Sequence, residues 1–171
     1  VMVNHKGQLI SLVTALPNQF VKEALAKNEI PIFNDYTLIR PEIPVGKHRF
    51  DFLLKDPNGL EFYLEVKSVT FVENGVAQFP DAVTERGTKH ALALKKLVEQ
   101  GKGAGILFVC QRPDAHSFRP MWERDPKLAN AVLEANKAGV KVWCITLNIS
   151  KTELTFNKEI PVNLELNIGK S

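Results

Sequence analysis

The sequence predicts an α/β fold, a mixed central sheet flanked by helices, with an antiparallel front and crossover connections behind it. Residues 56–59, Asp-Pro-Asn-Gly, separate two runs of alternating apolar residues and predict a β-hairpin. Two later segments with helical apolar spacing are each followed by a short apolar run, a pattern typical of crossover connections. At 171 residues, the chain is expected to form one domain over residues 1–171.

The other elements are expected in the following order. A strand over residues 9–13 precedes a helix that Asn18 caps at its start and Asn28 ends at the C′ position. The proline-punctuated residues 38–43 are expected to form an edge strand, since proline cannot donate to a central ladder. After the hairpin come a helix over 88–100, a strand over 104–110, a helix over 126–138 and a strand over 140–147.

The composition is that of an ordinary folded protein, with 44% hydrophobic and 24% charged residues. The longest apolar stretch, near residues 104–110, is too short to span a bilayer, and no charged-then-apolar leader marks the chain for export. Cys110 and Cys144 lie in apolar runs, which favours reduced core thiols over a disulfide framework or a metal site. We therefore expect a cytoplasmic protein that does not associate with membranes.

Basic residues gather in one part of the chain. The formal net charge is +3, but residues 84–112 hold six Lys or Arg against two Glu, a local excess of +4. This excess is compatible with a polyanion as the partner. A solvated helix face explains it about as well.

The turn of the hairpin determines which residues face each other. Residues 56–59 suit a three-residue loop, a type I turn followed by a glycine bulge, in which residue 56 pairs with residue 60. That register places Asp51 opposite Glu65 and Arg49 opposite Lys67. The apolar alternation requires the same register, because it must bring one set of side chains onto one face: Phe50, Phe52, Leu54, Phe62, Leu64 and Val66. Asp51, Glu65 and Lys67 are therefore expected together on the other face.

Two directly opposed carboxylates repel each other, so this pair is an unfavourable cross-strand neighbour unless something positive lies between them. A divalent cation between Asp51 and Glu65 reverses the sign of that interaction. Oxygen ligands without Cys or His favour Mg²⁺ or Mn²⁺ over Zn²⁺. Lys67 could hold a water or neutralise charge on a phosphate. The alternative is a solvated face on which Arg49 and Lys67 simply offset the two acids, and the hairpin alone favours neither.

An acidic residue on one strand and Glu-x-Lys on the next, among helices in this order, resembles the PD-(D/E)xK, or restriction-endonuclease-like, core. Phe50 stands where that motif has its proline. The segments "LPNQFVKEAL", "RFDFLL", "EVKSVT", "FPDAVTERGTKH" and "ILFVCQRPDA" are more specific. Together they resemble the sugar fermentation stimulation protein A (SfsA) family over residues 1–161. The resemblance implies a DNA-binding protein linked to sugar-utilisation regulation, with a nuclease-like domain; the family's N-terminal OB-like barrel is expected to be absent here.

Carried over to this sequence, the resemblance assigns Asp51, Glu65 and Lys67 to the nuclease-type core. Glu23 could add a metal ligand from the first helix, although a surface glutamate explains it better. Asp81, with Glu85, could complete the metal shell, or Asp81 could shape a turn after Pro80.

The candidate DNA contacts are cationic. Arg86 and Lys89 flank the start of a helix, where the macrodipole disfavours cations and a phosphate would offset that cost. His90 could relay a proton, or simply bond to a neighbour. Arg112 ends a buried strand, a common place for site residues, but could equally pair with a surface carboxylate. Arg49 completes the expected phosphate contacts.

Two functions follow from these residues together with the resemblance, which alone implies the link to sugar metabolism. One is a sequence-nonspecific DNA-binding protein that hydrolyses phosphodiester bonds with Mg²⁺ or Mn²⁺, with Asp51 and Glu65 holding the ion and Lys67 orienting water. The other is a non-catalytic DNA-binding regulator of sugar (maltose) metabolism on a nuclease scaffold. A nucleotide-binding enzyme fits poorly, because the Gly-rich "GKGAG" precedes a strand instead of following one.

Overall fold

A computed structural model describes residues 2–5, 8–11 and 15–166 of the chain. Its elements follow in chain order: β1 Met2–His5, β2 Gln8–Ser11, α1 Ala15–Lys27, the 3₁₀ turn η1 Pro31–Phe33, β3 Thr37–Val45, β4 His48–Lys55, β5 Glu61–Val69, β6 Phe71–Glu73, β7 Val76–Phe79, α2 Glu85–Glu99, β8 Gly103–Cys110, β9 Ser117–Pro120, α3 Pro126–Ala138, β10 Lys141–Ile149 and β11 Leu154–Ile160.

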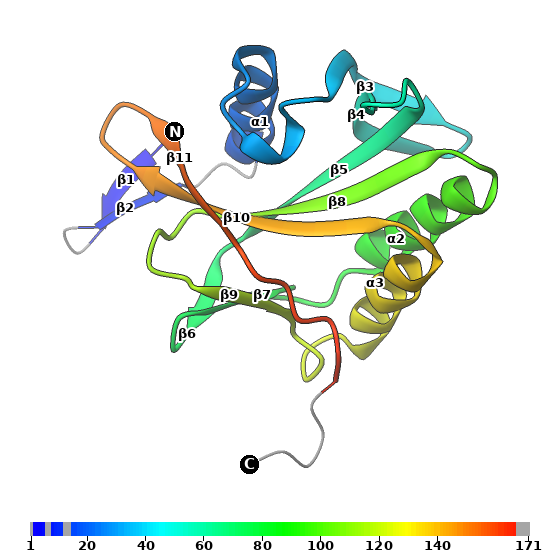
Figure 1. Ribbon diagram of the computed structural model, residues 1–171. Helices are drawn as coiled ribbons and strands as arrows, with labels where there is room; N and C mark the ends of the chain where they lie inside the picture. Colours follow the sequence, from blue (N-terminus) through cyan, green and yellow to red (C-terminus); the bar gives the residue numbers. More distant parts are fainter. Residues whose placement is uncertain (1, 6–7, 12–14, 167–171) are drawn as a thin grey trace.

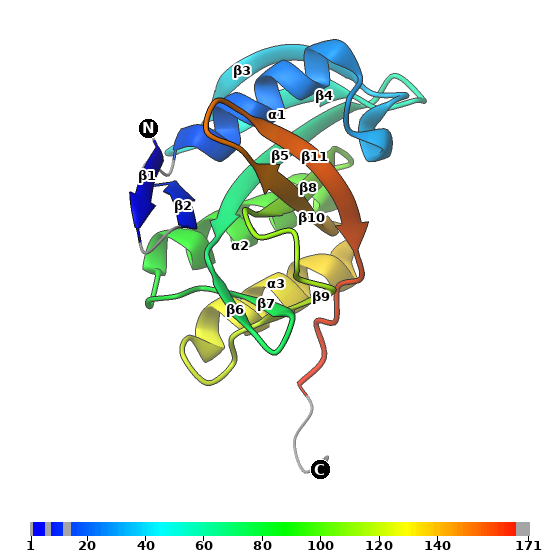
Figure 2. The same cartoon turned by 90° about the vertical axis from the view of Figure 1, so that its left-hand side faces the viewer.

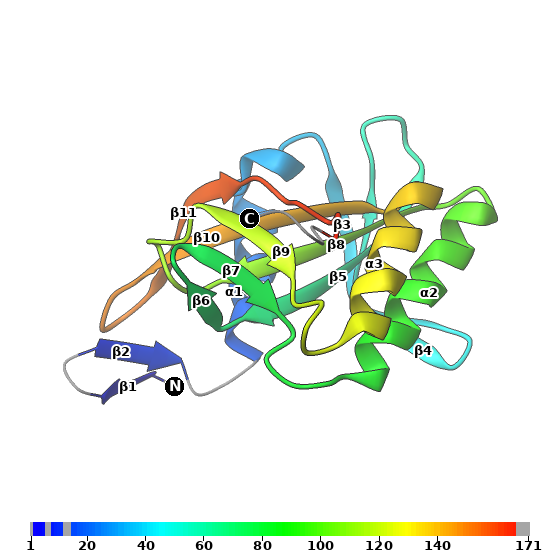
Figure 3. The same ribbon diagram turned by 90° about the horizontal axis from the view of Figure 1, so that it is seen from below.

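A six-stranded mixed sheet forms the centre, in the order β11-β10-β8-β5-β4-β3. The strands β5, β8 and β10 pair in parallel, whereas β3, β4 and β5 form an antiparallel meander. Helix α1 covers one face, and α2 and α3 lie side by side on the other (Figure 1). The predicted fold class is therefore confirmed. The β1–β2 hairpin lies to one side (Figure 2), and β6, β7 and β9 form a second small sheet next to α3 (Figure 3).

Two apolar cores hold the layers together. Beneath α2 and α3, the helix residues Leu94 and Leu128 pack with Phe108 of the sheet. On the other face, Val21 of α1 packs with Leu64 and other sheet residues. Because each face of the sheet is buried by a helix, the central strand β8 is apolar along almost its whole length.

The hairpin has the predicted register. The Asp56 amide donates to the Leu60 carbonyl over 2.9 Å, Gly59 has a φ of +81°, and pairing runs from Lys55–Glu61 to Phe52–Leu64. The ladder ends there, so it includes neither the expected Asp51–Glu65 pair nor the expected Arg49–Lys67 pair. The prediction for Phe50 was wrong: it packs in the core under α2, whereas Phe52 and Leu54 pack under α1. The alternation of faces breaks where the two strands separate.

Two helix starts also differ from the predictions. Helix α1 begins at Ala15, so Asn18 lies inside its first turns and is not the cap. Helix α2 begins at Glu85, three residues before the expected start, because the Thr84 side chain accepts a hydrogen bond from the Gly87 amide and caps it. Asn28 has the expected left-handed conformation after α1, with a φ of +55°. Cys110 and Cys144 are buried free thiols, as expected.

Candidate metal and nucleic-acid site

Asp51 lies where β4 and β5 separate. Its Oδ2 accepts a hydrogen bond of 2.7 Å from the Val66 amide, and its Oδ1 accepts one of 2.8 Å from Nδ2 of Asn18 in α1. The Asp51 side chain therefore accepts the hydrogen bond of the Val66 amide just beyond Phe52–Leu64, the last backbone pair of the two strands. These two bonds fix the carboxylate of Asp51 between α1 and β5.

Glu65 is the buried member of the site, with 3% of its surface exposed. Its Oε2 accepts a hydrogen bond of 2.5 Å from Nδ1 of His90 in α2 and lies 3.2 Å from Nζ of Lys67. Its Oε1 is buried and has no hydrogen-bond partner among the residues that the structure describes. One carboxylate oxygen is therefore fully used and the other retains its acceptor capacity.

The two carboxylates have opposite pKa shifts. Burial, followed by repulsion from the neighbouring Glu65 carboxylate, raises the pKa of Asp51 to about 7. Burial alone would also raise the pKa of Glu65, but the hydrogen bond from His90 and the charge of Lys67 outweigh it and hold that pKa below its ordinary value. The two neighbouring carboxylates disfavour each other's ionisation, so a cation bound to both would stabilise the ionised pair.

The donor set fits a hard divalent cation with few protein ligands. Asp51 and Glu65 supply carboxylate oxygens, and Glu65 Oε1 is a buried acceptor to which none of the described residues donates. Within residues 2–5, 8–11 and 15–166, no three or more His, Cys, Asp or Glu side chains form a metal-binding group. Mg²⁺ is typically bound by one or two carboxylates and completes its shell with waters and substrate phosphates. A structural zinc site, which needs four protein ligands, does not fit.

Three of the predicted cations are exposed on the elements that carry the site. Arg86 and Lys89 are exposed on the first turns of α2, and Arg86 lies four residues before His90 on the same side of the helix. Arg49 is exposed on β4, two residues from Asp51. His90 is only 6% exposed and bonds to Glu65, so it lies inside the site and not on the surface.

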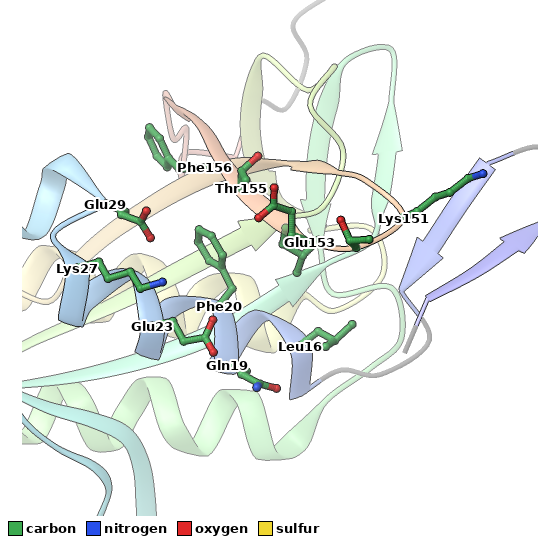
Figure 4. A pocket seen from close by; sticks show the side chains of 12 residues that line it. Leu16, Gln19, Phe20, Glu23, Lys27, Glu29, Lys151, Glu153, Thr155 and Phe156 are labelled. Carbon is green, nitrogen blue, oxygen red and sulfur yellow. The ribbon is translucent and has the colours of Figure 1, made fainter.

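The structure does not bring three of the other candidates to this site. Glu23 is exposed and lines a groove of about 830 Å³ between α1 and the β10–β11 turn (Figure 4). Asp81 is exposed, with its carboxylate 3.9 Å from the Arg124 guanidinium. Arg112 forms a 2.7 Å ion pair with Asp114, the alternative that the sequence left open. Since Glu23 and Asp81 lie elsewhere, Asp51 and Glu65 are the acids on which the metal site depends.

Sequence reasoning missed two residues of the site. Asn18 was assigned to a helix cap, although its amide bonds to Asp51, 33 positions away. His48 was not among the candidates, but its ring lies edge-on to His90 with centroids 5.6 Å apart. Nothing in the local sequence marks either contact, because each depends on how a helix packs on the sheet.

Comparison with known proteins identifies the family. Residues 15–153 match the family model described as the sugar fermentation stimulation protein RE domain. This chain belongs to the SfsA family. Its similarity to a sugar fermentation stimulation protein homolog from Clostridium tetani is 41% identity over 158 residues, covering 92% of this chain and 69% of the relative. A homolog from Clostridium botulinum strain Alaska E43 is 41% identical over 161 residues, covering 94% and 70%.

A solved SfsA structure has the same fold. The structure of Pyrococcus furiosus SfsA in complex with Ca²⁺ superposes on this chain with a TM-score of 0.85 at 29% identity, covering 95% of this chain and 70% of that one. The predicted resemblance to the SfsA family is therefore confirmed. In the described part of this SfsA-family chain, no helix is both long and apolar enough to cross a membrane.

Proposed function

We propose that this SfsA-family chain binds the phosphate backbone of DNA without sequence preference and hydrolyses phosphodiester bonds with Mg²⁺ or Mn²⁺ held by Asp51 and Glu65. The observation that carries the proposal is the arrangement of Asp51, Glu65 and Lys67 on two neighbouring strands, with a buried oxygen on Glu65 that has no partner in the described part of the chain. Membership of the family supports a DNA-binding, nuclease-like protein related to sugar fermentation at the family level.

The metal part of the proposal is supported by the SfsA relative of known structure. That protein was solved in complex with Ca²⁺, and Ca²⁺ and Mg²⁺ both prefer oxygen ligands. A bound divalent ion supplies Lewis-acid polarisation of a phosphoryl oxygen and a more acidic water. The choice of Mg²⁺ or Mn²⁺ rests on the small number of protein carboxylates.

The residues of the chain divide the remaining work. Asp51 and Glu65 orient the site because their carboxylates are fixed by hydrogen bonds. Lys67 is 20% exposed and 3.2 Å from Glu65, so its ammonium can orient a water or neutralise charge that develops on a phosphate. The exposed Arg86 and Lys89 on α2 are proposed to bind flanking phosphates.

Plasmid nicking tests the proposal. Supercoiled plasmid is incubated with the protein and Mg²⁺ or Mn²⁺, and the wild type is expected to convert it to the open-circular form. Asp51→Asn and Lys67→Met should each lower the rate by at least about 100-fold, since each removes charge from the reacting site. Glu61→Gln, on the same strand but exposed and paired with Lys102, is the matched control. No nicking by the wild type, or equal nicking by Asp51→Asn, would refute hydrolysis.

The second candidate is a non-catalytic DNA-binding regulator of sugar metabolism. The name shared by the clostridial relatives, sugar fermentation stimulation protein homolog, favours it. On this account duplex binding is independent of sequence and weakens steeply with salt. Arg86→Ala should flatten the slope of log affinity against log salt by about one, whereas Lys55→Ala, exposed at the hairpin end, should leave it unchanged. An unchanged slope for Arg86→Ala removes that residue from the interface.

A further inference from the structure

Each carboxylate of the site is held by a side chain from a different helix. Asn18 of α1 donates to Asp51 over 2.8 Å from one face of the sheet. His90 of α2 donates to Glu65 over 2.5 Å from the other face. The two helices lie on opposite sides of the sheet (Figure 1), so the acidic pair is braced from both directions.

We propose that Asn18 and His90 are positioning residues, which orient Asp51 and Glu65 for a divalent cation without contacting it. This inference rests on the proposed metal site but not on DNA cleavage. Hydrogen-bond partners of metal ligands orient the ligating group, and their loss typically costs 10- to 100-fold in metal affinity.

The hydrogen-bond capacity of the site agrees with this role. Asn18 and the Val66 amide each donate to a different oxygen of Asp51, which leaves one lone pair free on each oxygen. On Glu65, both donors use Oε2, and Oε1 remains unpartnered within the described residues. The hydrogen bonds therefore fix the orientation of both carboxylates and still leave each one with an oxygen lone pair that can bind a cation.

Both donors lie on helices that pack against the sheet. A carboxylate can only accept, so Nδ1 of His90 carries the hydrogen, and the ring is packed against Phe50 and His48 with centroids 5.8 and 5.6 Å away. Asn18 lies one turn before Val21, which is fully buried beneath α1. Because packing has already restricted the His90 ring, little conformational entropy is lost in that side chain when the site binds a ligand.

Calorimetric titration with Mn²⁺ and with Ca²⁺ tests the inference without measuring activity. Asn18→Ala should weaken metal binding by about 10- to 100-fold. Asn18→Asp loses the donor and adds a like charge beside Asp51, so it should weaken binding at least as much. If Asn18 were a ligand, the extra carboxylate would tighten binding, and that result would overturn the positioning role.

For His90, the conservative variant provides the decisive comparison. His90→Leu keeps bulk but removes the donor and should weaken binding by about 10- to 100-fold. His90→Asn places an amide nitrogen near the position of Nδ1, so it should restore affinity to within about threefold of the wild type. Equal weakening in both variants would mean that the bulk of His90, not its hydrogen bond, matters, and would refute its positioning role.

The exposed Asn130 on α3 supplies the control, and Asn130→Ala should bind metal as the wild type does. Urea unfolding of every variant shows that the titrated protein is folded. Wild-type affinity in both Asn18→Ala and His90→Leu would overturn this inference and leave the metal site standing. Absence of Mn²⁺ and Ca²⁺ binding by the wild type would refute the metal site itself.

Discussion

The charge of Asp51 should make the metal-free protein less stable as the pH rises. The folded protein retains the Asp51 proton up to a pKa of about 7, whereas the unfolded chain loses it near the ordinary aspartate pKa of 3.8. Between these values the folded state binds more protons, so the free energy of unfolding falls with increasing pH and levels off above pH 7. Glu65 has a lowered pKa and is ionised in both states above pH 5, so it adds no slope.

The size of the effect follows from the shift. One pKa unit corresponds to about 1.4 kcal/mol, so the rise in the Asp51 pKa from 3.8 to about 7 changes the free energy of unfolding by at most about 4 kcal/mol. Of this change, about 2–3 kcal/mol is expected between pH 5 and pH 8. The variant Asp51→Asn should lose this dependence of the free energy of unfolding on pH. The variant also loses one of the two hydrogen bonds that Asp51 accepts, a cost of about 1 kcal/mol that does not depend on pH.

Urea unfolding in EDTA at several pH values between 5 and 8 measures both contributions. The stability of Asp51→Asn relative to the wild type should rise by about 2–3 kcal/mol across this range. Asp35→Asn, at an exposed position, should follow the wild-type curve. Parallel curves for Asp51→Asn and the wild type would refute the electrostatic account of the acidic pair.

Three further variants test the fold that positions the site, each by urea unfolding. Asp125→Ala should cost about 1–3 kcal/mol, because this buried carboxylate accepts hydrogen bonds from the Leu128 and Thr84 amides and joins the starts of α3 and α2; a loss below about 0.5 kcal/mol would contradict this. Gly59→Ala should cost about 1–2 kcal/mol, since φ is +81°, and an unchanged midpoint would count against the turn. Leu94→Ala should cost about 2–5 kcal/mol because the side chain is fully buried, and a smaller loss would indicate a loosely packed core.

The hairpin could be predicted because its information is local. The turn chemistry of residues 56–59 and the alternation of apolar residues both specify one register, and the structure has that register from Lys55–Glu61 to Phe52–Leu64. From this alone Asp51 and Glu65 could be placed next to each other. The helix 126–138 was also correct to the residue, since Pro126 and Gly139 mark its two ends.

The rest depended on contacts between distant residues. The predicted face of Phe50 was wrong because the Asp51 side chain accepts the Val66 amide hydrogen bond, and the backbone pairing of the two strands ends there. Asn18 and His90 reach the site only when their helices pack on opposite faces of the sheet. The strands β6, β7, β9 and β11 were not predicted: three of them are only three or four residues long, and β11 pairs only along one edge of the sheet.

The most direct test of the metal site is anomalous scattering from crystals soaked in Mn²⁺. The proposed site predicts a manganese peak within coordination distance of one oxygen of Asp51 and of Oε1 of Glu65, and no peak there in Asp51→Asn. Well-ordered wild-type crystals with no manganese between these two carboxylates, or with manganese bound only elsewhere, would contradict the proposed site.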